Sequence, residues 1–160
     1  MAEVAKIKQI VYKGAVLADD NYTACVIALG IPEDARVVCG YSGDGKQRAN
    51  KAITLAISPI KDIDLSIQPF CHQTAFSIFS PAYGLYEYRI GWLQTPTKPF
   101  NSDPNVECAS GIHFFAKVEP AIEYGYAKWS CSILPEPSEG KETFVKFAKE
   151  QAKRYNTGSL

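Results

Sequence analysis

The densest group of reactive side chains lies between residues 107 and 115, in the run Glu-Cys-Ala-Ser-Gly-Ile-His-Phe-Phe. It combines the thiol of Cys108, a serine hydroxyl and the imidazole of His113, one of two histidines in the chain. A nucleophilic cysteine needs a neighbouring base, or an electropositive setting that lowers the pKa of its thiol. In a strand, the spacing puts Cys108 and His113 on opposite faces unless the chain bends at Gly111. We therefore assign no catalytic residue and expect Cys108 to be a small buried thiol.

Within this run we expect His113 to contact a ligand, together with the adjacent ring of Phe114. The alternative for His113 is a side chain that bonds to backbone. A zinc site would need Cys71, His72, Cys108 and His113, but adjacent residues such as Cys71 and His72 seldom both reach one tetrahedral ion. The usual spacers of two to four residues are also absent. We expect neither a metal nor a cofactor.

A group of cations follows the glycine-rich turn at residues 42–45. Lys46, Arg48 and Lys51 are expected on one side of an extended segment, where they could bind phosphate or carboxylate. Backbone amides at a glycine turn can add an anion-binding nest. The nucleotide P-loop pattern Gly-x-x-x-x-Gly-Lys-Ser/Thr is missing. The alternative is a solvated edge strand whose lysines discourage aggregation.

Arg89 is a further candidate cation, because it stands among the aromatic and branched residues of a predicted strand. Such an arginine either extends to solvent or turns inward to meet an anion. The full set of expected ligand-binding residues is Lys46, Arg48, Lys51, Arg89, His113 and Phe114.

Size and charge limit the classes of function. The chain has 160 residues, which suits a single domain over 1–160. Its 17 basic and 17 acidic side chains cancel, so no long-range attraction draws it to a polyanion. We expect no general nucleic-acid binding. The five cysteines are an odd number. With no export signal and no apolar run long enough for a membrane span, they indicate a cytoplasmic protein.

The elements that would position these residues are mostly strands. Alternation together with branched and aromatic residues predicts strands over 4–12, 22–29, 36–41, 52–58, 63–67, 75–79, 86–92 and 129–134. Residues 93–106 contain three prolines and are predicted to be a loop, which is more often functional than idle at that length.

Two helices complete the predicted fold. A short helix is expected near 119–126, where Pro120 suits a first turn. A long C-terminal helix is expected after a cap at Ser138, with an apolar stripe formed by Phe144, Ala148, Ala152 and Tyr155. The prediction is an α+β domain with a strand-rich, mostly antiparallel sheet.

Four motifs carry a family resemblance. In order they are Ile31-Pro32-Glu33-Asp34-Ala35, Lys46-x-Arg48-Ala49-x-Lys51-Ala52, Tyr88-Arg89-Ile90-Gly91 and the run at 107–115. Together they resemble an uncharacterised domain family of bacteriophage and giant-virus proteins, sometimes joined to pentapeptide repeats. The resemblance spans roughly residues 22 to 126 and implies a phage or prophage origin, a place in the host-cell cytoplasm and no established activity. Where that family usually has cysteine in its basic motif, this chain has Gln47, so position 47 carries no thiol.

The later half also resembles the ADP-ribosyltransferase fold. The similar segments are Arg89-Ile90-Gly91, the residues 111–114 and the residues 121–126. This resemblance implies an NAD-using enzyme or a degenerate relative, with His113 standing where those enzymes have tyrosine.

The sequence therefore favours a viral, non-enzymatic binding or accessory protein. Such a protein would sequester a small anionic, nucleotide-derived ligand, or hold a host or viral protein, in counter-defence. The alternatives are an ADP-ribosyltransferase-like enzyme and a structural virion component, and an oligomer is compatible with each.

Overall fold

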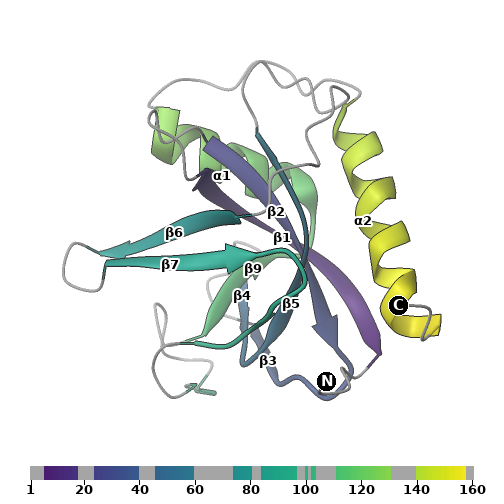
Figure 1. Cartoon of the computed structure of the whole chain (residues 1–160). Coiled ribbons are helices and arrows are strands. Elements are labelled where there is room, and N and C mark those ends of the chain that lie inside the picture. Colours follow the sequence, from purple (N-terminus) through teal and green to yellow (C-terminus); the bar gives the residue numbers. More distant parts are fainter. Residues whose placement is uncertain are drawn as a thin grey trace.

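Nine strands and two helices make up the described part of the protein, which is a computed structural model covering residues 6–17, 24–39, 46–59, 74–80, 84–96, 100, 102–103, 111–130 and 140–157 (Figure 1). The strands are β1 (Ile7–Leu17), β2 (Ala24–Pro32), β3 (Val37–Cys39), β4 (Lys46–Ala49), β5 (Ala52–Pro59), β6 (Thr74–Ser80), β7 (Gly84–Arg89), β8 (Leu93–Gln94) and β9 (Ile112–Phe115). The helices are α1 (Val118–Ser130) and α2 (Gly140–Thr157). The predicted α+β class is confirmed.

The sheet branches at β1. Its main path runs β3-β4-β9-β1-β2-β5-β8, and β6 and β7 lie off this path. One edge of β1 pairs with β2, while the other pairs with β9 at Tyr12 and with β6 at Val16 and Leu17. The pairings of the described strands are antiparallel. The strands β9 and β6 therefore separate from each other along one side of β1.

The central strand β2 is buried along its whole length, because both faces of the sheet are covered. Successive side chains of a strand point to opposite faces. Val26 and Ala28 accordingly belong to the core under the helices, and Ile27 and Leu29 belong to a second core on the other face. This explains why β2 reads as a continuous apolar run rather than an alternating one.

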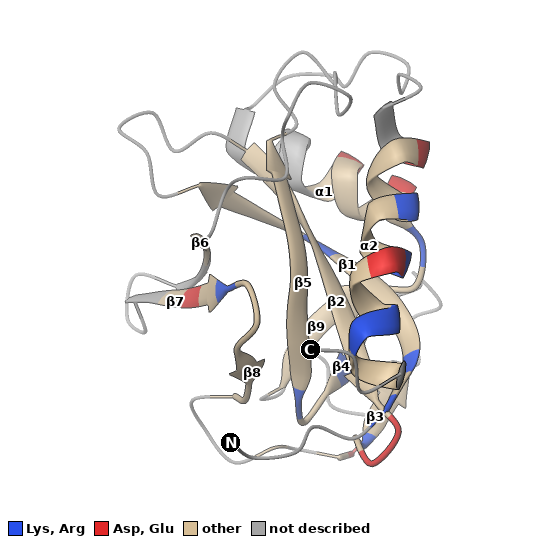
Figure 2. Ribbon diagram, turned by 45° about the vertical axis from the view of Figure 1, so that its right-hand side comes forward, with Lys and Arg blue, Asp and Glu red and all other residues tan. Residues whose placement is uncertain are grey.

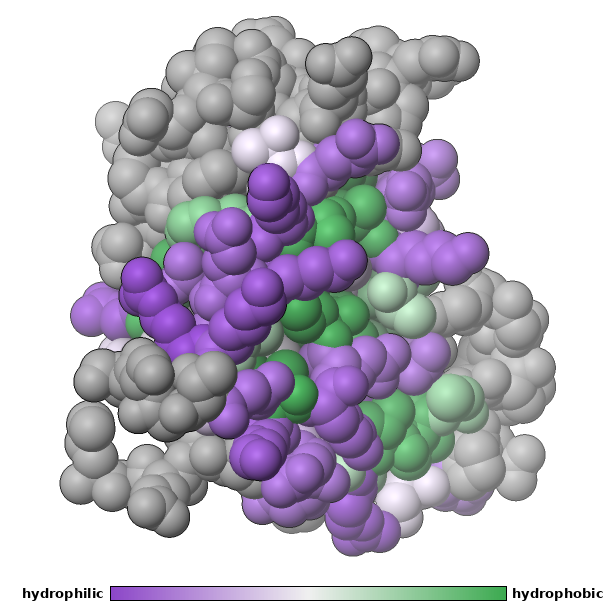
Figure 3. Space-filling model, turned by 90° about the vertical axis from the view of Figure 1, so that its right-hand side faces the viewer, coloured by the Kyte–Doolittle hydropathy of each residue, from purple (hydrophilic) through white to green (hydrophobic). Residues whose placement is uncertain are grey.

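The two helices cover one face of the sheet. From α1, Val118, Ala121 and Ile122 enter the first core. From α2, the side chains of Phe144, Ala148 and Ala152 are buried at intervals of four residues, and Tyr155 is half-buried at the edge of the same core. The apolar stripe predicted for the C-terminal helix is confirmed. Figure 3 shows that the outer surface on this side is mainly hydrophilic, with apolar residues visible between the charged ones.

A side-chain amide joins the C-terminal helix to the first strand. Asn156 Oδ1 accepts a hydrogen bond from the amide of Ile7 at 2.7 Å, and Asn156 Nδ2 donates to the Ile7 carbonyl at 3.2 Å. Asn156 thus pairs with Ile7 as a neighbouring strand would.

The second core is closed by another amide, that of Gln94 on β8. Gln94 Nε2 donates to the Glu87 carbonyl at 3.1 Å and to the Tyr86 hydroxyl at 3.2 Å. Gln94 Oε1 accepts from the Arg89 amide at 3.0 Å and from the Thr54 hydroxyl at 3.2 Å. Since β8 also pairs with β5, Gln94 connects β7 to β5 and brings the two branches of the sheet together around the second core.

Several predicted boundaries are corrected. The first strand continues to Leu17, and the seventh ends at Arg89 because Gly91 has a φ of 87°, which forms a turn before β8. The predicted loop at 93–106 therefore starts with a short strand. Trp129 and Ser130 are helical rather than the start of a strand. The strand predicted at 63–67 and the cap at Ser138 lie outside the described residues. Neither helix of the described segments is long and apolar enough to cross a bilayer.

Candidate functional site

Two of the expected ligand residues lie side by side on β4 and β9. In the antiparallel register Arg48 stands directly opposite His113, and Lys46 stands opposite Phe115. Directly opposite residues share one face of a sheet, and residues two apart on one strand do as well. Arg48, His113 and Phe115 therefore lie on a common face, and two of them, Arg48 and His113, belong to the set expected from the sequence to bind a ligand.

Arg48 is unusually buried for an arginine, with 4% of its surface exposed. Its Nη2 atom donates to the backbone carbonyl of Asp103 at 2.5 Å, which ties Asp103 to β4. The bare backbone of Gly111 makes room for this arrangement. A Cβ atom at Gly111 would lie 3.0 Å from Arg48 Cβ and 3.2 Å from Phe100 Cε1.

Lys13 reaches the same strand from the opposite edge, at the branch of the sheet. Its Nζ donates to the carbonyl of His113 at 3.0 Å. Strand β1 pairs with β9 at Tyr12. The next residue, Lys13, binds the β9 backbone through its ammonium group where the two strands separate. The backbone of His113 thus lies between β4, where Arg48 stands opposite it, and the Lys13 ammonium of β1.

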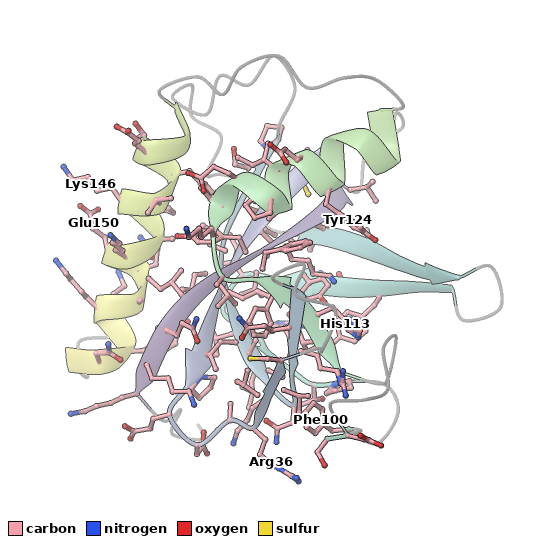
Figure 4. All side chains as sticks on the ribbon, turned by 180° about the vertical axis from the view of Figure 1, so that it is seen from behind. Arg36, Phe100, His113, Tyr124, Lys146 and Glu150 are labelled. Carbon is pink, nitrogen blue, oxygen red and sulfur yellow. The ribbon has the colours of Figure 1, made fainter. Side chains whose placement is uncertain are left out.

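Aromatic rings extend this group in both directions. We define the His113 row as Tyr124, Phe115, His113, Arg48 and Phe100. The rings of Phe115 and Tyr124 are 5.9 Å apart. At the other end, Phe100 lies beside Arg48 and its ring centroid is 5.8 Å from the Arg36 guanidinium. Figure 4 shows Tyr124, His113 and Phe100 following one another down one side of the molecule.

Solvent reaches the middle of the His113 row. His113 and Phe115 are half-buried, and Tyr124 is 38% exposed. The row offers the Arg48 guanidinium, the His113 imidazole and flat rings, a combination whose chemistry suits a planar anion through charge-assisted hydrogen bonds and stacking.

The remaining expected residues lie elsewhere. Lys51 lies beyond the end of β4 and forms an ion pair with Asp34 at 2.6 Å, so the expected line of three cations is wrong. The hydrogen bond from Lys51 holds the pKa of the Asp34 carboxyl below its ordinary value. Phe114 faces away from the row and is 1% exposed in the second core.

Arg89 does not join the His113 row. It forms an ion pair with Glu87 at 3.3 Å, and its guanidinium lies 4.8 Å from the ring centroid of Trp92. Figure 2 shows the end of β7 separated from β4 by β5 and β2. Of the expected ligand residues, Arg48 and His113 are therefore together, and Arg89 is on a different surface.

Four residues of this site were missed from the sequence, and one of them is Phe115, whose neighbour Phe114 was selected instead. Lys13 stood just past a predicted strand end, Phe100 stood in a predicted loop, and Tyr124 stood in a short predicted helix. The pairing of β9 with β1 brings Lys13 near His113, whereas Tyr124 reaches the site from α1 through its contact with Phe115. In the described segments, no three His, Cys, Asp or Glu side chains are grouped as metal ligands. Cys71, His72 and Cys108 lie outside those segments.

Comparisons with known proteins give one match. A protein-family model described as a family of unknown function matches residues 3–121, which include all nine strands and the start of α1 but not α2. No curated protein matches the chain. No solved structure matches it.

Proposed function

We propose that this chain, which belongs to the family of unknown function DUF5758, is a non-enzymatic binding domain that holds a small anionic, nucleotide-derived ligand on the His113 row. The observation that carries the proposal is the cross-strand pairing of Arg48 with His113, beside which the Lys13 ammonium bonds to the His113 carbonyl. Local cations such as Arg48 and Lys13 suit a small anion even though the whole chain has no net charge.

The position of each group suggests how the ligand would lie. A phosphate would meet the imidazole of His113 and the guanidinium of Arg48, and a base or other planar ring would stack against Phe115 and Tyr124. Hydrogen bonds to charged groups contribute about 1.5–3 kcal/mol each, and ring stacking adds about 0.5–1.5 kcal/mol. The set supplies binding without a nucleophile paired to a base, so no chemical step is part of the proposal.

The biological part of the proposal is a viral accessory role in counter-defence, in the cytoplasm of the host. Its support is the resemblance of the four motifs to phage and giant-virus domains. Sequestering a nucleotide-derived signal requires affinity but no turnover, which agrees with a row built from donors and rings.

Isothermal titration calorimetry tests the binding. The probes are ADP-ribose, a cyclic dinucleotide and inorganic phosphate. We expect heat with at least one nucleotide probe, and His113→Phe should weaken that binding about tenfold because it keeps a ring but removes both ring nitrogens. The matched control is Lys146→Ala, which removes an exposed cation of α2 far from the row (Figure 4).

Three results would overturn the proposal. The first is no heat with any probe, and the second is equal binding by the His113→Phe variant. The third is turnover: hydrolysis of labelled NAD, or labelling of protein by it, would favour the transferase alternative. Detection of the chain in purified virus particles by mass spectrometry would instead favour a structural role.

A further inference from the structure

A second surface stands apart from the His113 row, at the turn between β7 and β8. Trp92 and Leu93 are each 46% exposed and are consecutive in the chain. Exposed single apolar residues are common, but adjacent large ones on a surface are typical of interaction sites. We define the Trp92 surface as Glu87, Arg89, Trp92 and Leu93.

The Trp92 surface is held in a fixed shape by the backbone. The Gly91 amide donates to the Thr54 carbonyl at 2.9 Å, and the Thr54 amide donates to the Trp92 carbonyl at 3.3 Å. The Trp92 amide donates to the Arg89 carbonyl at 3.0 Å. A turn whose backbone is already fixed loses less conformational entropy on binding, which favours association.

The charges next to the apolar pair are self-complementary. Arg89 and Glu87 form an ion pair at 3.3 Å, with 48% and 35% of their side chains exposed. An exposed pair of this kind contributes little to the fold, so either member can exchange its partner at small cost. From residue 90 to residue 96 the turn and β8 carry no charged side chain.

We propose that the occupant of the Trp92 surface is a second copy of this chain. In a two-fold dimer the same patch meets itself, so Arg89 of each copy would face Glu87 of the other while Trp92 and Leu93 pack in the centre. A patch with one cation, one anion and an apolar centre satisfies this requirement without an oppositely charged partner. Tryptophan and arginine are also among the residues that contribute most to interfaces. The dimer is independent of the ligand proposed for the His113 row.

Sedimentation equilibrium of the full chain over a wide concentration range tests the dimer. The surface is small beside the roughly 800 Å² that each partner contributes to a standard interface, so the wild type should associate weakly and reversibly. Trp92→Ala combined with Leu93→Ser should remain a monomer. The control is Tyr124→Ala, which removes an exposed aromatic side chain on α1, away from the Trp92 surface. This variant should dimerise like the wild type.

Charge exchange gives the sharpest comparison. Glu87→Arg alone, or Arg89→Glu alone, places like charges in contact across the two-fold axis and should weaken the dimer about tenfold or more. The two substitutions together restore opposite charges and should return the dissociation constant to within about threefold of the wild type. A wild type that stays monomeric overturns the inference. The inference is also overturned if the doubly substituted variant dimerises no more tightly than either single variant, provided that circular dichroism shows every variant to be folded.

Discussion

Removal of Gln94 tests whether a single amide closes the second core. Gln94 is 4% exposed and makes four hydrogen bonds, two of them to backbone groups of β7. In Gln94→Ala, the Glu87 carbonyl and the Arg89 amide lose these partners, as do the hydroxyls of Tyr86 and Thr54. A buried group left unsatisfied costs about 1–3 kcal/mol, and groups that water can reach cost less. We expect the free energy of unfolding to fall by about 3 kcal/mol.

The Gln94→Glu variant adds a pH test with nearly the same shape. One carboxyl oxygen would replace the amide nitrogen that faces the Glu87 carbonyl, so burial and this opposing dipole should raise the pKa of the new carboxyl. A carboxyl whose folded-state pKa is raised contributes stability below its unfolded pKa, about 4.3, and loses that stability as the pH rises through the folded value. The free energy of unfolding of Gln94→Glu should therefore lie closer to that of the wild type near pH 4 than near pH 8.

Urea unfolding followed by tryptophan fluorescence measures these losses, and hydrogen exchange at the Arg89 amide shows whether the bond to Gln94 is the cause. Gln151→Ala, a change at a half-buried glutamine of α2, serves as the matched control and should be close to wild type. The reasoning fails if Gln94→Ala costs less than about 1 kcal/mol while the Arg89 amide keeps its protection.

Three further changes test other parts of the structure. Gly111→Ala should cost about 1–3 kcal/mol in urea unfolding, because the new Cβ would press on Arg48 at 3.0 Å; a neutral result would show that the neighbouring segment yields freely. Burial, aided by a nearby carboxylate, raises the pKa of Tyr12 to about 12. The free energy of unfolding should therefore fall by about 2 kcal/mol as the pH rises from ~10 towards 12. The Tyr12→Phe variant should not show this part of the loss. Asn156→Ala should cost about 1 kcal/mol and speed hydrogen exchange at the amide of Ile7, whereas unchanged exchange would contradict the paired-amide bonding.

Local sequence patterns predicted the class of fold because they report which faces are buried. The apolar stripe of α2 is periodic over many residues and the apolar run of β5 is continuous, and the observed elements follow both patterns. Boundaries were less accurate where a single residue decides them. Gly91 ends the seventh strand early through its positive φ, and Lys13 sits inside β1 because that strand spans both branches of the sheet.

The candidate site was only partly predictable, since its members meet through strand pairing rather than through sequence spacing. His113 and Arg48 are far apart in the chain and adjacent in the register of β4 and β9. No local pattern specifies that register. The same limit explains Lys51: its position looked continuous with the basic segment, but β4 ends before it and Asp34 is its partner.

The short strands at the two ends of the main path of the sheet have a consequence for solubility. An exposed strand edge is a template on which another chain can add, and short edge strands reduce that hazard. The main path ends in β3, with three residues, and in β8, with two, while the long apolar strands β1 and β2 lie inside. Pro96 follows β8 closely and has no amide hydrogen to extend the ladder. Engineered lengthening of β8 through this position would create a longer free edge, and we expect the altered protein to form fibrous aggregates more readily than the natural chain.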